Sequence, residues 1–144
     1  MRVADLISSR KEVYSVTESA TVYDVARYLR HHEVRSVGVL DGDGKLAGVV
    51  SQSDISDHVA AENKCPAWMR VTEIMTRDLV TVSPEMGLEE CLLLMEKHGV
   101  FHLLVVGEGG RFFGAISVTD LLRVISSDQK ARADLLESFV FPKR

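Results

Sequence analysis

The spacing of hydrophobic residues predicts that strands and helices alternate along the chain. Apolar residues recur at helical spacing between positions 22 and 29, and a second set recurs at the same spacing between 88 and 95. Short runs rich in β-branched residues at 13–16 and 79–82 precede these helices and predict strands. Each half of the chain therefore opens with a strand that is followed by an amphipathic helix.

Each of these helices is followed by a predicted β-hairpin and a last helix. Both hairpin turns are polar and contain glycines, which can adopt the positive φ that a tight turn needs. The last helices are expected to begin at about Ser53 and Thr119. The strands and turns of the hairpins are predicted at 36–40, 41–44 and 45–51 in the first half and at 102–106, 107–110 and 111–117 in the second.

The two halves are copies of one unit. A shift of 66 positions aligns residues 13–55 with 79–121 without a gap. Upstream, residues 3–7 resemble 71–75 at an offset of 68, which implies two extra residues in the first copy within 8–12. Such a repeat predicts one βαββα unit used twice, each copy needing a neighbour to cover its apolar face. The identical pairs are Val16/Val82, His32/His98, Val34/Val100, Val39/Val105, Gly44/Gly110, Gly48/Gly114, Ser51/Ser117 and Asp54/Asp120.

The composition is that of a globular protein in a reducing compartment. Of the 144 residues, 46% are hydrophobic, and the net charge of −4 disfavours binding to nucleic acid or anionic membranes through global electrostatics. No run approaches the roughly 20 apolar residues of a membrane span, and Asp5 interrupts the stretch that a signal peptide would keep apolar. We expect a soluble cytoplasmic protein whose Cys65 and Cys91 form no disulfide framework or metal site.

The strongest chemical signal is the Gly-x-x-Ser-x-x-Asp sequence that ends each hairpin. A serine hydroxyl at a helix start accepts bonds from free backbone N–H groups, which can also hold a phosphate. A carboxylate three residues later can accept bonds from the hydroxyls of a ribose. The alternative is a capping box without a ligand. Because a cap alone does not require the preceding glycine in both copies, we favour nucleotide contact at Ser51 with Asp54 and at Ser117 with Asp120.

This duplicated arrangement resembles the tandem cystathionine-β-synthase (CBS) domain pair. The likeness covers nearly the whole chain and is strongest at 48–54 and 114–120. It implies an α+β fold in which two βαββα repeats form a pseudo-twofold pair. It also implies a stand-alone regulatory module for ligand sensing and signal transduction, without catalysis. The expected boundaries are 1–62 for the first repeat, 63–70 for the linker, 71–137 for the second repeat and 138–144 for a tail.

The resemblance further implies where a ligand binds. Members of the family bind adenosyl compounds, so the expected ligand is AMP, ADP, ATP, NAD or S-adenosylmethionine, and no cofactor is required. In the family, each cleft joins the Asp-bearing helix of one copy to the first strand and the helix-to-strand turn of the other. The resulting clefts combine Ser117 and Asp120 with Tyr14 and Val34, and Ser51 and Asp54 with Val80 and Val100.

Polar residues beside these positions complete the candidate nucleotide site. Phosphate-binding members often carry a basic residue just after the position of Val34, and Arg35 offers a guanidinium that can fork around phosphate oxygens. The alternative, weighted equally, is a solvated charge at a helix end. The second copy has Phe101 and then His102 there, so the two clefts are expected to be unequal. His102 and Thr119 are also taken as nucleotide-binding candidates.

Other features that resemble chemical sites are better explained by structure. The turn 41–44 is similar to the start of a calcium loop, but Lys45 and Gln52 stand at ligand positions. His31 and His32 are adjacent on a helix and point apart, so no metal site is predicted. No nucleophile with a matching base can be recognised, and we therefore assign no catalytic residue.

The helices of the second copy predict a partner. They are apolar on more than one face, as Leu93 and Leu94 beside the main apolar stripe illustrate, and such helices are usually buried on more than one side. The resemblance points to a homodimer, and a thicker monomer core is the alternative. An unidentified regulated protein is also expected. The competing functions are a nucleic-acid-binding regulator, which the acidic balance opposes, and a small enzyme acting on a nucleotide.

Overall fold

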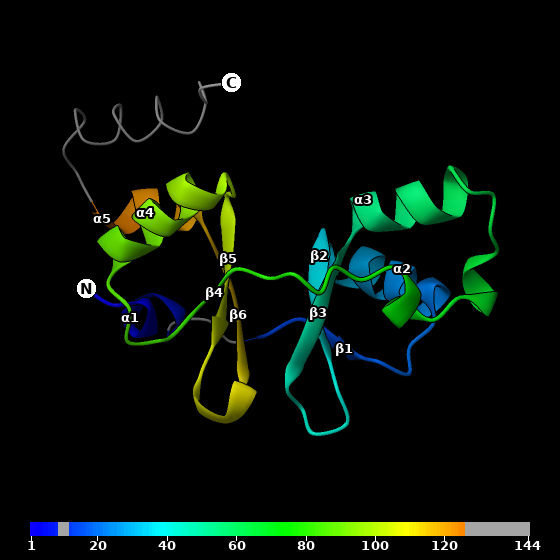
Figure 1. Ribbon diagram of the computed structural model, residues 1–144, viewed down its shortest axis with the longest axis horizontal. Helices are drawn as coiled ribbons and strands as arrows, with labels where there is room; N and C mark the ends of the chain where they lie inside the picture. The colour runs from blue at the N-terminus through cyan, green and yellow to red at the C-terminus, as the bar shows by residue number, and fades with distance from the viewer. Residues whose placement is uncertain (9–11, 126–144) are drawn as a thin grey trace. The chain divides into compact units, whose positions relative to one another are not determined.

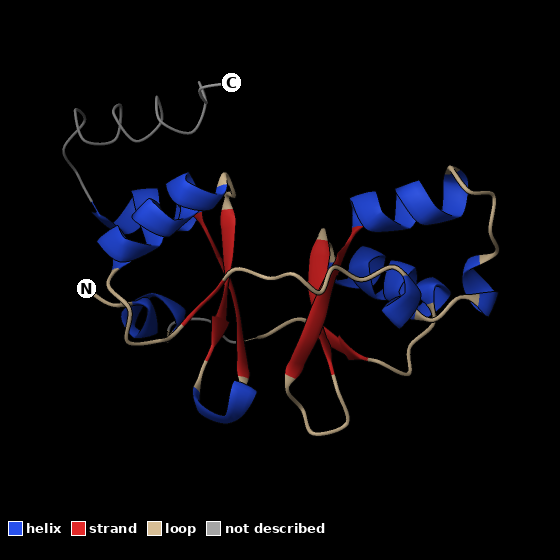
Figure 2. Cartoon of the chain, in the orientation of Figure 1, coloured by secondary structure: helices blue, strands red, loops and turns tan. Residues whose placement is uncertain are grey.

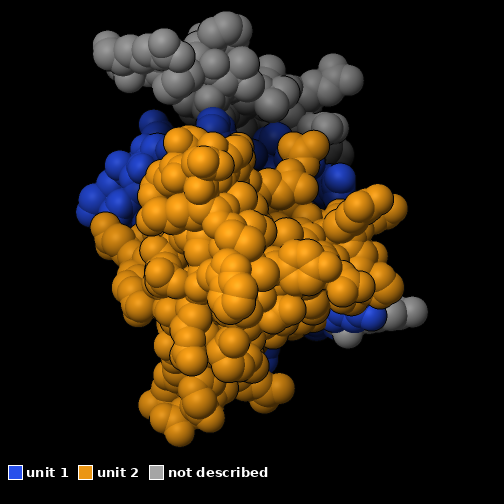
Figure 3. Space-filling view, turned by 90° about the vertical axis from the view of Figure 1, so that its right-hand side faces the viewer, with its two compact units in different colours: residues 1–12, 80–107, 113–144 blue, residues 13–79, 108–112 orange. Residues whose placement is uncertain are grey.

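The computed structural model describes residues 1–8 and 12–125, which form two compact units (Figure 1). Unit 1 comprises Met1–Glu12, Val80–Gly107 and the chain from Phe113 onward, and unit 2 comprises Val13–Leu79 and Glu108–Phe112; Figure 3 colours them separately. The predicted insertion within 8–12, the end of the second repeat and the tail at 138–144 involve positions outside the described residues.

Unit 2 contains the βαββα order predicted for the first repeat. Its three strands form a sheet of order β1-β2-β3, in which β1 runs parallel to β2 and β3 runs antiparallel to it. Helices α2 and α3 lie on the same side of this sheet (Figure 1). The elements are β1 (Ser15–Thr17), α2 (Val22–His32), β2 (Ser36–Leu40), β3 (Leu46–Ser51), α3 (Gln52–Ile55) and the π-helix η1 (Ser56–Ala60).

Unit 1 repeats this order and adds a helix at the start of the chain. Its strands form the sheet β4-β5-β6, with β4 parallel to β5 (Figure 2). Within the described part of the chain, no helix is both long and apolar enough to cross a membrane. The elements are α1 (Val3–Ile7), β4 (Thr81–Val82), α4 (Leu88–His98), β5 (His102–Val106), β6 (Phe112–Ser117, its first residue counted with unit 2) and α5 (Val118–Ile125).

Each unit buries its own hydrophobic core. The helical spacing at 22–29 and 88–95 is confirmed, because the stripe of each helix faces the core of its unit. The core of unit 2 is formed by Val22, Val25, Leu29, Val37, Val39, Val50, Met69, Val71, Ile74 and Met75. The core of unit 1 is formed by Val3, Val82, Leu88, Cys91, Leu92, Met95, Leu103, Val105, Ile116 and Leu121.

The segment that precedes each repeat's first strand packs in the unit formed by the other repeat. In unit 1, the Val3 N–H donates to the Met86 carbonyl at 2.9 Å, and Arg2 bridges Gly87. In unit 2, the 3₁₀-helix η3 (Val71–Glu73) follows an equivalent bridge between Arg70 and Thr21. These two chain exchanges could not be seen in a linear alignment, which keeps each segment with its own copy.

The first strand of each repeat is shorter than predicted. The runs 13–16 and 79–82 predicted strands, but β1 begins at Ser15 and β4 at Thr81. Tyr14 and Val80 contribute only their carbonyls, which accept from Gly38 N–H at 3.3 Å and from Leu104 N–H at 3.2 Å. These two apolar residues therefore adjoin the strands and pack against the cores from their ends.

The glycine that opens the Gly-x-x-Ser-x-x-Asp sequence in the first copy has a packing role. Val49 and Thr76 exchange two backbone hydrogen bonds of 3.0 and 2.8 Å, which bring the end of the exchanged segment against β3. A Cβ on Gly48 would lie 2.7 Å from the sulfur of Met75 and 2.9 Å from the carbonyl oxygen of Thr76. In the second copy, Gly114 has a φ of 106°, which a side chain disfavours. The backbone and its packing therefore explain why glycine stands at both positions, without reference to a ligand.

We predict that Gly48→Ala lowers the free energy of unfolding by about 1–3 kcal/mol, because the new methyl group meets backbone as well as a side chain. Gly42→Ala is the matched control, since a Cβ there has no neighbour within 4 Å. Chemical denaturation of both variants checks this. Equal stabilities of the two variants would contradict the close approach of the exchanged segment to β3.

Candidate functional site

Strand pairing brings the predicted site residues of the first copy to one end of the sheet in unit 2. Because β1 and β2 are parallel, Tyr14 and Arg35, which stand just before them, lie at the same end. The antiparallel β3 ends there, with Ser51 paired to Ser36. The N–H of Gln52 donates to the Arg35 carbonyl at 2.9 Å and fixes the start of α3 beside the α2–β2 turn. The structure thus places Tyr14, Val34, Arg35, Ser51 and Asp54 around one sheet end.

Unit 1 has the same arrangement at the end of β4-β5-β6. Val80 precedes β4, and His102 is the first residue of β5. The N–H of Val118 donates to the Phe101 carbonyl at 2.9 Å, as Gln52 does to Arg35 in unit 2. This end of the sheet therefore collects Val80, Val100, His102, Ser117, Thr119 and Asp120.

Ser51 and Asp54 form a closed capping box. The Ser51 hydroxyl accepts from the Asp54 N–H at 3.2 Å, and Asp54 Oδ2 accepts from the Ser51 N–H at 2.8 Å and lies 3.0 Å from the hydroxyl. All three contacts are partly buried. Asp54 Oδ1 has no hydrogen-bond partner among the residues the structure describes. One carboxylate oxygen is thus fixed by the helix start while the other can accept from a ligand hydroxyl.

Ser117 and Asp120 form the corresponding box at the start of α5. Asp120 Oδ2 accepts from the Ser117 N–H at 2.9 Å, and the Ser117 hydroxyl accepts from the Asp120 N–H at 3.2 Å. Both residues are partly buried, whereas Thr119 between them is exposed. The capping alternative to nucleotide contact is therefore present in both copies.

A third capping box shows that the box alone does not define a ligand site. Thr21 and Asp24 make the same two reciprocal bonds of 3.1 Å at the start of α2. The hydrogen bond from the Thr21 backbone holds the pKa of Asp24 below its ordinary value, and the group is exposed. What distinguishes the other two boxes is their partial burial and their place beside a helix-to-strand turn at a sheet end.

The candidate phosphate residues lie on the surface. The Arg35 side chain is exposed and forms no ion pair within the described residues, and His102 is exposed as well. Val34 and Val100, by contrast, are half-buried, and each packs against the core of its unit. The exposed guanidinium fits both a phosphate contact and a solvated helix-end charge.

A cluster of aromatic rings beside Tyr14 was not predicted from the sequence. The His32 ring lies 4.2 Å from the Tyr28 ring and 5.3 Å from the Tyr14 ring, measured between centroids. The Tyr28 hydroxyl accepts from the Ser15 N–H at 3.2 Å. The available signal was the repeat itself, since Tyr14 and Tyr28 align with aliphatic residues in the second copy.

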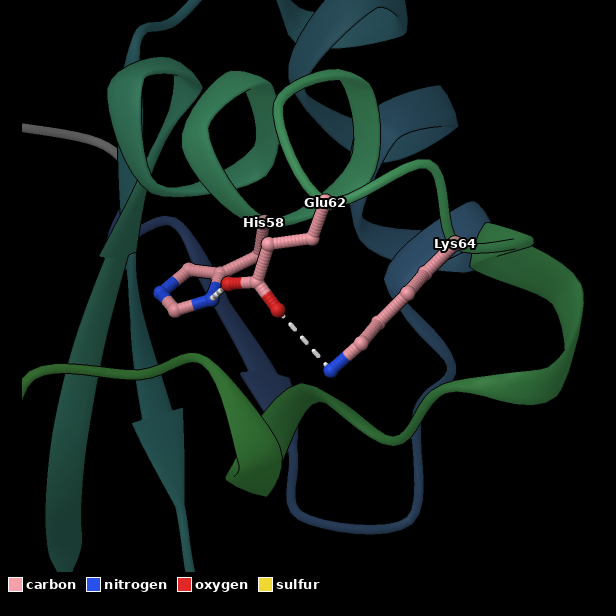
Figure 4. Close-up of polar contacts among 3 residues, drawn as sticks. All are labelled: His58, Glu62 and Lys64. Atoms are coloured by element: carbon pink, nitrogen blue, oxygen red, sulfur yellow. Dashed lines mark hydrogen bonds and ion pairs between the residues drawn. The ribbon is translucent and has the colours of Figure 1, made fainter.

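The helix that begins at the Ser51 box ends in a surface ion-pair network (Figure 4). Glu62 receives His58 Nδ1 at 2.8 Å on one carboxylate oxygen and Lys64 Nζ at 2.9 Å on the other. The hydrogen bond from Lys64, followed by that from His58, lowers the pKa of Glu62. Such exposed pairs contribute little to stability, so this network serves mainly to fasten the end of the helix to the following loop.

The cysteines and the Asp41 carboxylate have structural surroundings in the described part of the chain. Burial raises the pKa of the Cys91 thiol to about 11, so it stays protonated at neutral pH, and Cys65 is exposed without a partner base among the described residues. No group of three metal-binding side chains occurs in the part of the chain that the structure describes. The Asp41 carboxylate accepts from the N–H groups of Asp43 and Lys45 and thus serves the turn.

Two cavities that each lie within a single unit are lined by residues other than the predicted site residues. An open cavity of about 730 Å³ in unit 2 is lined by Thr17, Leu40 and Asp41, at the opposite end of the sheet from Ser51, together with Arg70 and Arg77. A cavity of about 420 Å³ in unit 1 lies over the start of α4. The predicted pairing of Ser117 and Asp120 with Tyr14 and Val34 joins the two units and stays a prediction.

The chain belongs to the CBS-domain family, as the resemblance predicted. The CBS domain matches residues 3–61 and 71–127, which together make up most of the chain. A solved protein with CBS domains from Burkholderia ambifaria MC40-6 is 32% identical to this chain and has a TM-score of 0.74. The match covers 90% of this chain and 96% of that protein. The expected mixed fold with two repeats is thereby confirmed.

Two other relatives are longer proteins, of which this chain spans less than half. The homoserine O-acetyltransferase of Methanococcoides burtonii is 32% identical over 85% of this chain, which spans 24% of that enzyme. Protein MJ1232 of Methanocaldococcus jannaschii is 30% identical over 81% of this chain, which spans 37% of its length. The CBS domain pair of protein MJ0100 was solved with 5′-methylthioadenosine and S-adenosyl-L-methionine. It is 22% identical to this chain, and the match covers 87% of this chain and 95% of that domain pair with a TM-score of 0.72. This likeness shows the shared fold.

Proposed function

We propose that the chain is a regulatory module that binds an adenosyl ligand and transmits its presence to a partner protein without catalysing a reaction. The observation that carries this proposal is the convergence, in each unit, of a strand edge, an apolar turn residue and a partly buried capping box at one end of the sheet. Together these groups offer an apolar wall, backbone contacts and a carboxylate for a ribose, which is the composition of a small-ligand site.

Two further observations support an adenosyl ligand. Asp54 Oδ1, which has no hydrogen-bond partner among the described residues, is an acceptor that helix capping does not use. The MJ0100 domain pair, which shares the fold, binds 5′-methylthioadenosine and S-adenosyl-L-methionine. AMP, ADP, ATP, NAD and S-adenosylmethionine all carry the adenosyl group and remain the candidate ligands. Arg35 is the proposed phosphate contact, and His102 and Thr119 are proposed to lie at the edge of the other site.

We also propose that the module is a homodimer. Most of the apolar surplus on α4 and α5 is buried in the core of unit 1, and Leu94 packs partly against it. Leu93 is the exception, with 65% of its surface exposed in the middle of α4. We infer that this exposed aliphatic side chain contributes to a contact with a second copy of the chain, which supplies the same residue by symmetry.

An adenosyl ligand should raise the melting temperature of the protein. At about 100 times its dissociation constant, a ligand adds roughly 2.7 kcal/mol to the free energy of unfolding. Thermal melts with millimolar AMP, ATP, NAD and S-adenosylmethionine check this. Combining Asp54→Asn with Asp120→Asn should abolish the shift, whereas Asp24→Asn, in the exposed third box, should retain it. If none of the panel shifts the wild-type melt, the proposed function is wrong.

Leu93→Glu should convert a dimer to a monomer, because it places a charge on the apolar contact. Sedimentation velocity at micromolar concentrations distinguishes the two species. Leu94→Glu is a poor control because that residue packs against the core, so Glu96→Gln, on an exposed position of the same helix, is the matched variant. A wild-type protein that stays monomeric at high micromolar concentration would rule out the dimer.

A further inference from the structure

The first strand of each repeat leaves one residue's backbone groups facing away from the sheet. β1 and β4 are edge strands, each paired on one side only. Ser15 pairs in register with Gly38, and Gly38 N–H donates to the Tyr14 carbonyl, so the N–H and C=O of Ser15 point outward. Thr81 has the same position opposite Leu104. Both outward edges lie next to the sheet end that carries the capping box.

The two outward edges differ in one hydrogen bond. In unit 2, the Ser15 N–H donates to the Tyr28 hydroxyl at 3.2 Å, and the Tyr28 ring is held by His32 at 4.2 Å between centroids. In unit 1, the position of Tyr28 is taken by Leu94, which has no acceptor. Thr81 is exposed, and its N–H has no partner in the part of the chain that the structure describes. One edge is thus occupied by a side chain, and the other is open to a ligand.

An open extended residue is suited to an adenine base. Its N–H and C=O point to the same side and form a donor beside an acceptor. The Watson–Crick edge of adenine offers the complementary pair, an acceptor at N1 beside the N6 amino donor, and proteins commonly read an exposed base through this edge. A hydroxyl already bonded to the N–H removes the donor and fills the space that the base needs.

We propose that Thr81 is the backbone contact that reads the adenine base, and that Tyr28 closes the equivalent edge at Ser15. Tyr28 is therefore a specificity-determining residue that restricts the chain to one high-affinity adenosyl site. This inference rests on the proposed function and deepens it, because it assigns the base contact and explains an unequal occupancy of two otherwise matched sites.

Calorimetric titration of the full chain with adenosine and with AMP tests the inference. The wild type should bind one equivalent tightly, and Tyr28→Phe, which removes only the hydroxyl, should bind a second equivalent with at least roughly tenfold higher affinity than the second site of the wild type. Tyr23→Phe, an exposed tyrosine on the same helix, is the matched control and should behave as the wild type.

A second variant tests the open edge directly. Thr81→Pro removes the outward N–H, and an edge strand tolerates proline where that N–H is not part of the ladder; a thermal melt without ligand checks that the variant folds. It should lose the tight equivalent. Two equal sites in the wild type, or an unchanged titration of Tyr28→Phe, would overturn this inference and leave the proposed function standing. Absence of any adenosyl binding to the wild type would overturn both.

Discussion

The pairing of the exchanged segments with the opposite unit is the interaction on which the rest of this structure depends. The core of unit 2 includes Met69 from the linker and Val71, Ile74 and Met75 from the start of the second repeat. Val3, from the start of the chain, is fully buried in unit 1. Neither sequence copy therefore contains a complete core, which is the physical reason the repeat occurs as a pair.

The same pairing positions the candidate site. The bonds between Val49 and Thr76 pair the outer edge of β3 at Val49, two residues before Ser51 and the start of α3. The turn is then fixed by the bond from Gln52 to the Arg35 carbonyl and closed by the Ser51 box. A capping box that would be ordinary elsewhere, like that at Thr21, is thereby held partly buried beside a strand edge. Its partial burial and its position, more than its hydrogen bonds, distinguish it from the exposed box at Thr21.

Periodicity and self-alignment were enough to predict the order of elements. Val22, Val25 and Leu29 face the core as their spacing required, and Ser51 caps α3 as its motif required. The short first strands were predicted too early, because Tyr14 and Val80 are β-favouring residues whose carbonyls alone join the sheet. From the sequence, Gly48 is interpreted as part of a ligand-binding motif. The lack of space for a side chain beside Met75 becomes evident only when the exchanged segment is placed against β3.

The part of the site that sequence could not supply is the environment of each edge. The bond between Tyr28 and Ser15 links a helix to a strand 13 positions away, and no local pattern encodes it. The repeat did record the difference, since Tyr28 aligns with Leu94, but a tyrosine in an amphipathic helix is first read as core. Because Leu94 replaces Tyr28 in the second copy, the Thr81 N–H lacks the side-chain acceptor that the Ser15 N–H has.

We expect the box-bearing end of each sheet, and not the hairpin end, to receive the ligand. Backbone amide chemical shifts recorded during a titration with AMP test it most directly, because every unit carries both ends. The account predicts that the largest changes fall on Arg35, Gln52 and Asp54 and on Thr81 and His102, while the hairpin residues Asp43 and Gly44 stay unmoved. Changes concentrated at the hairpin end, around Thr17 and Asp41, would contradict it.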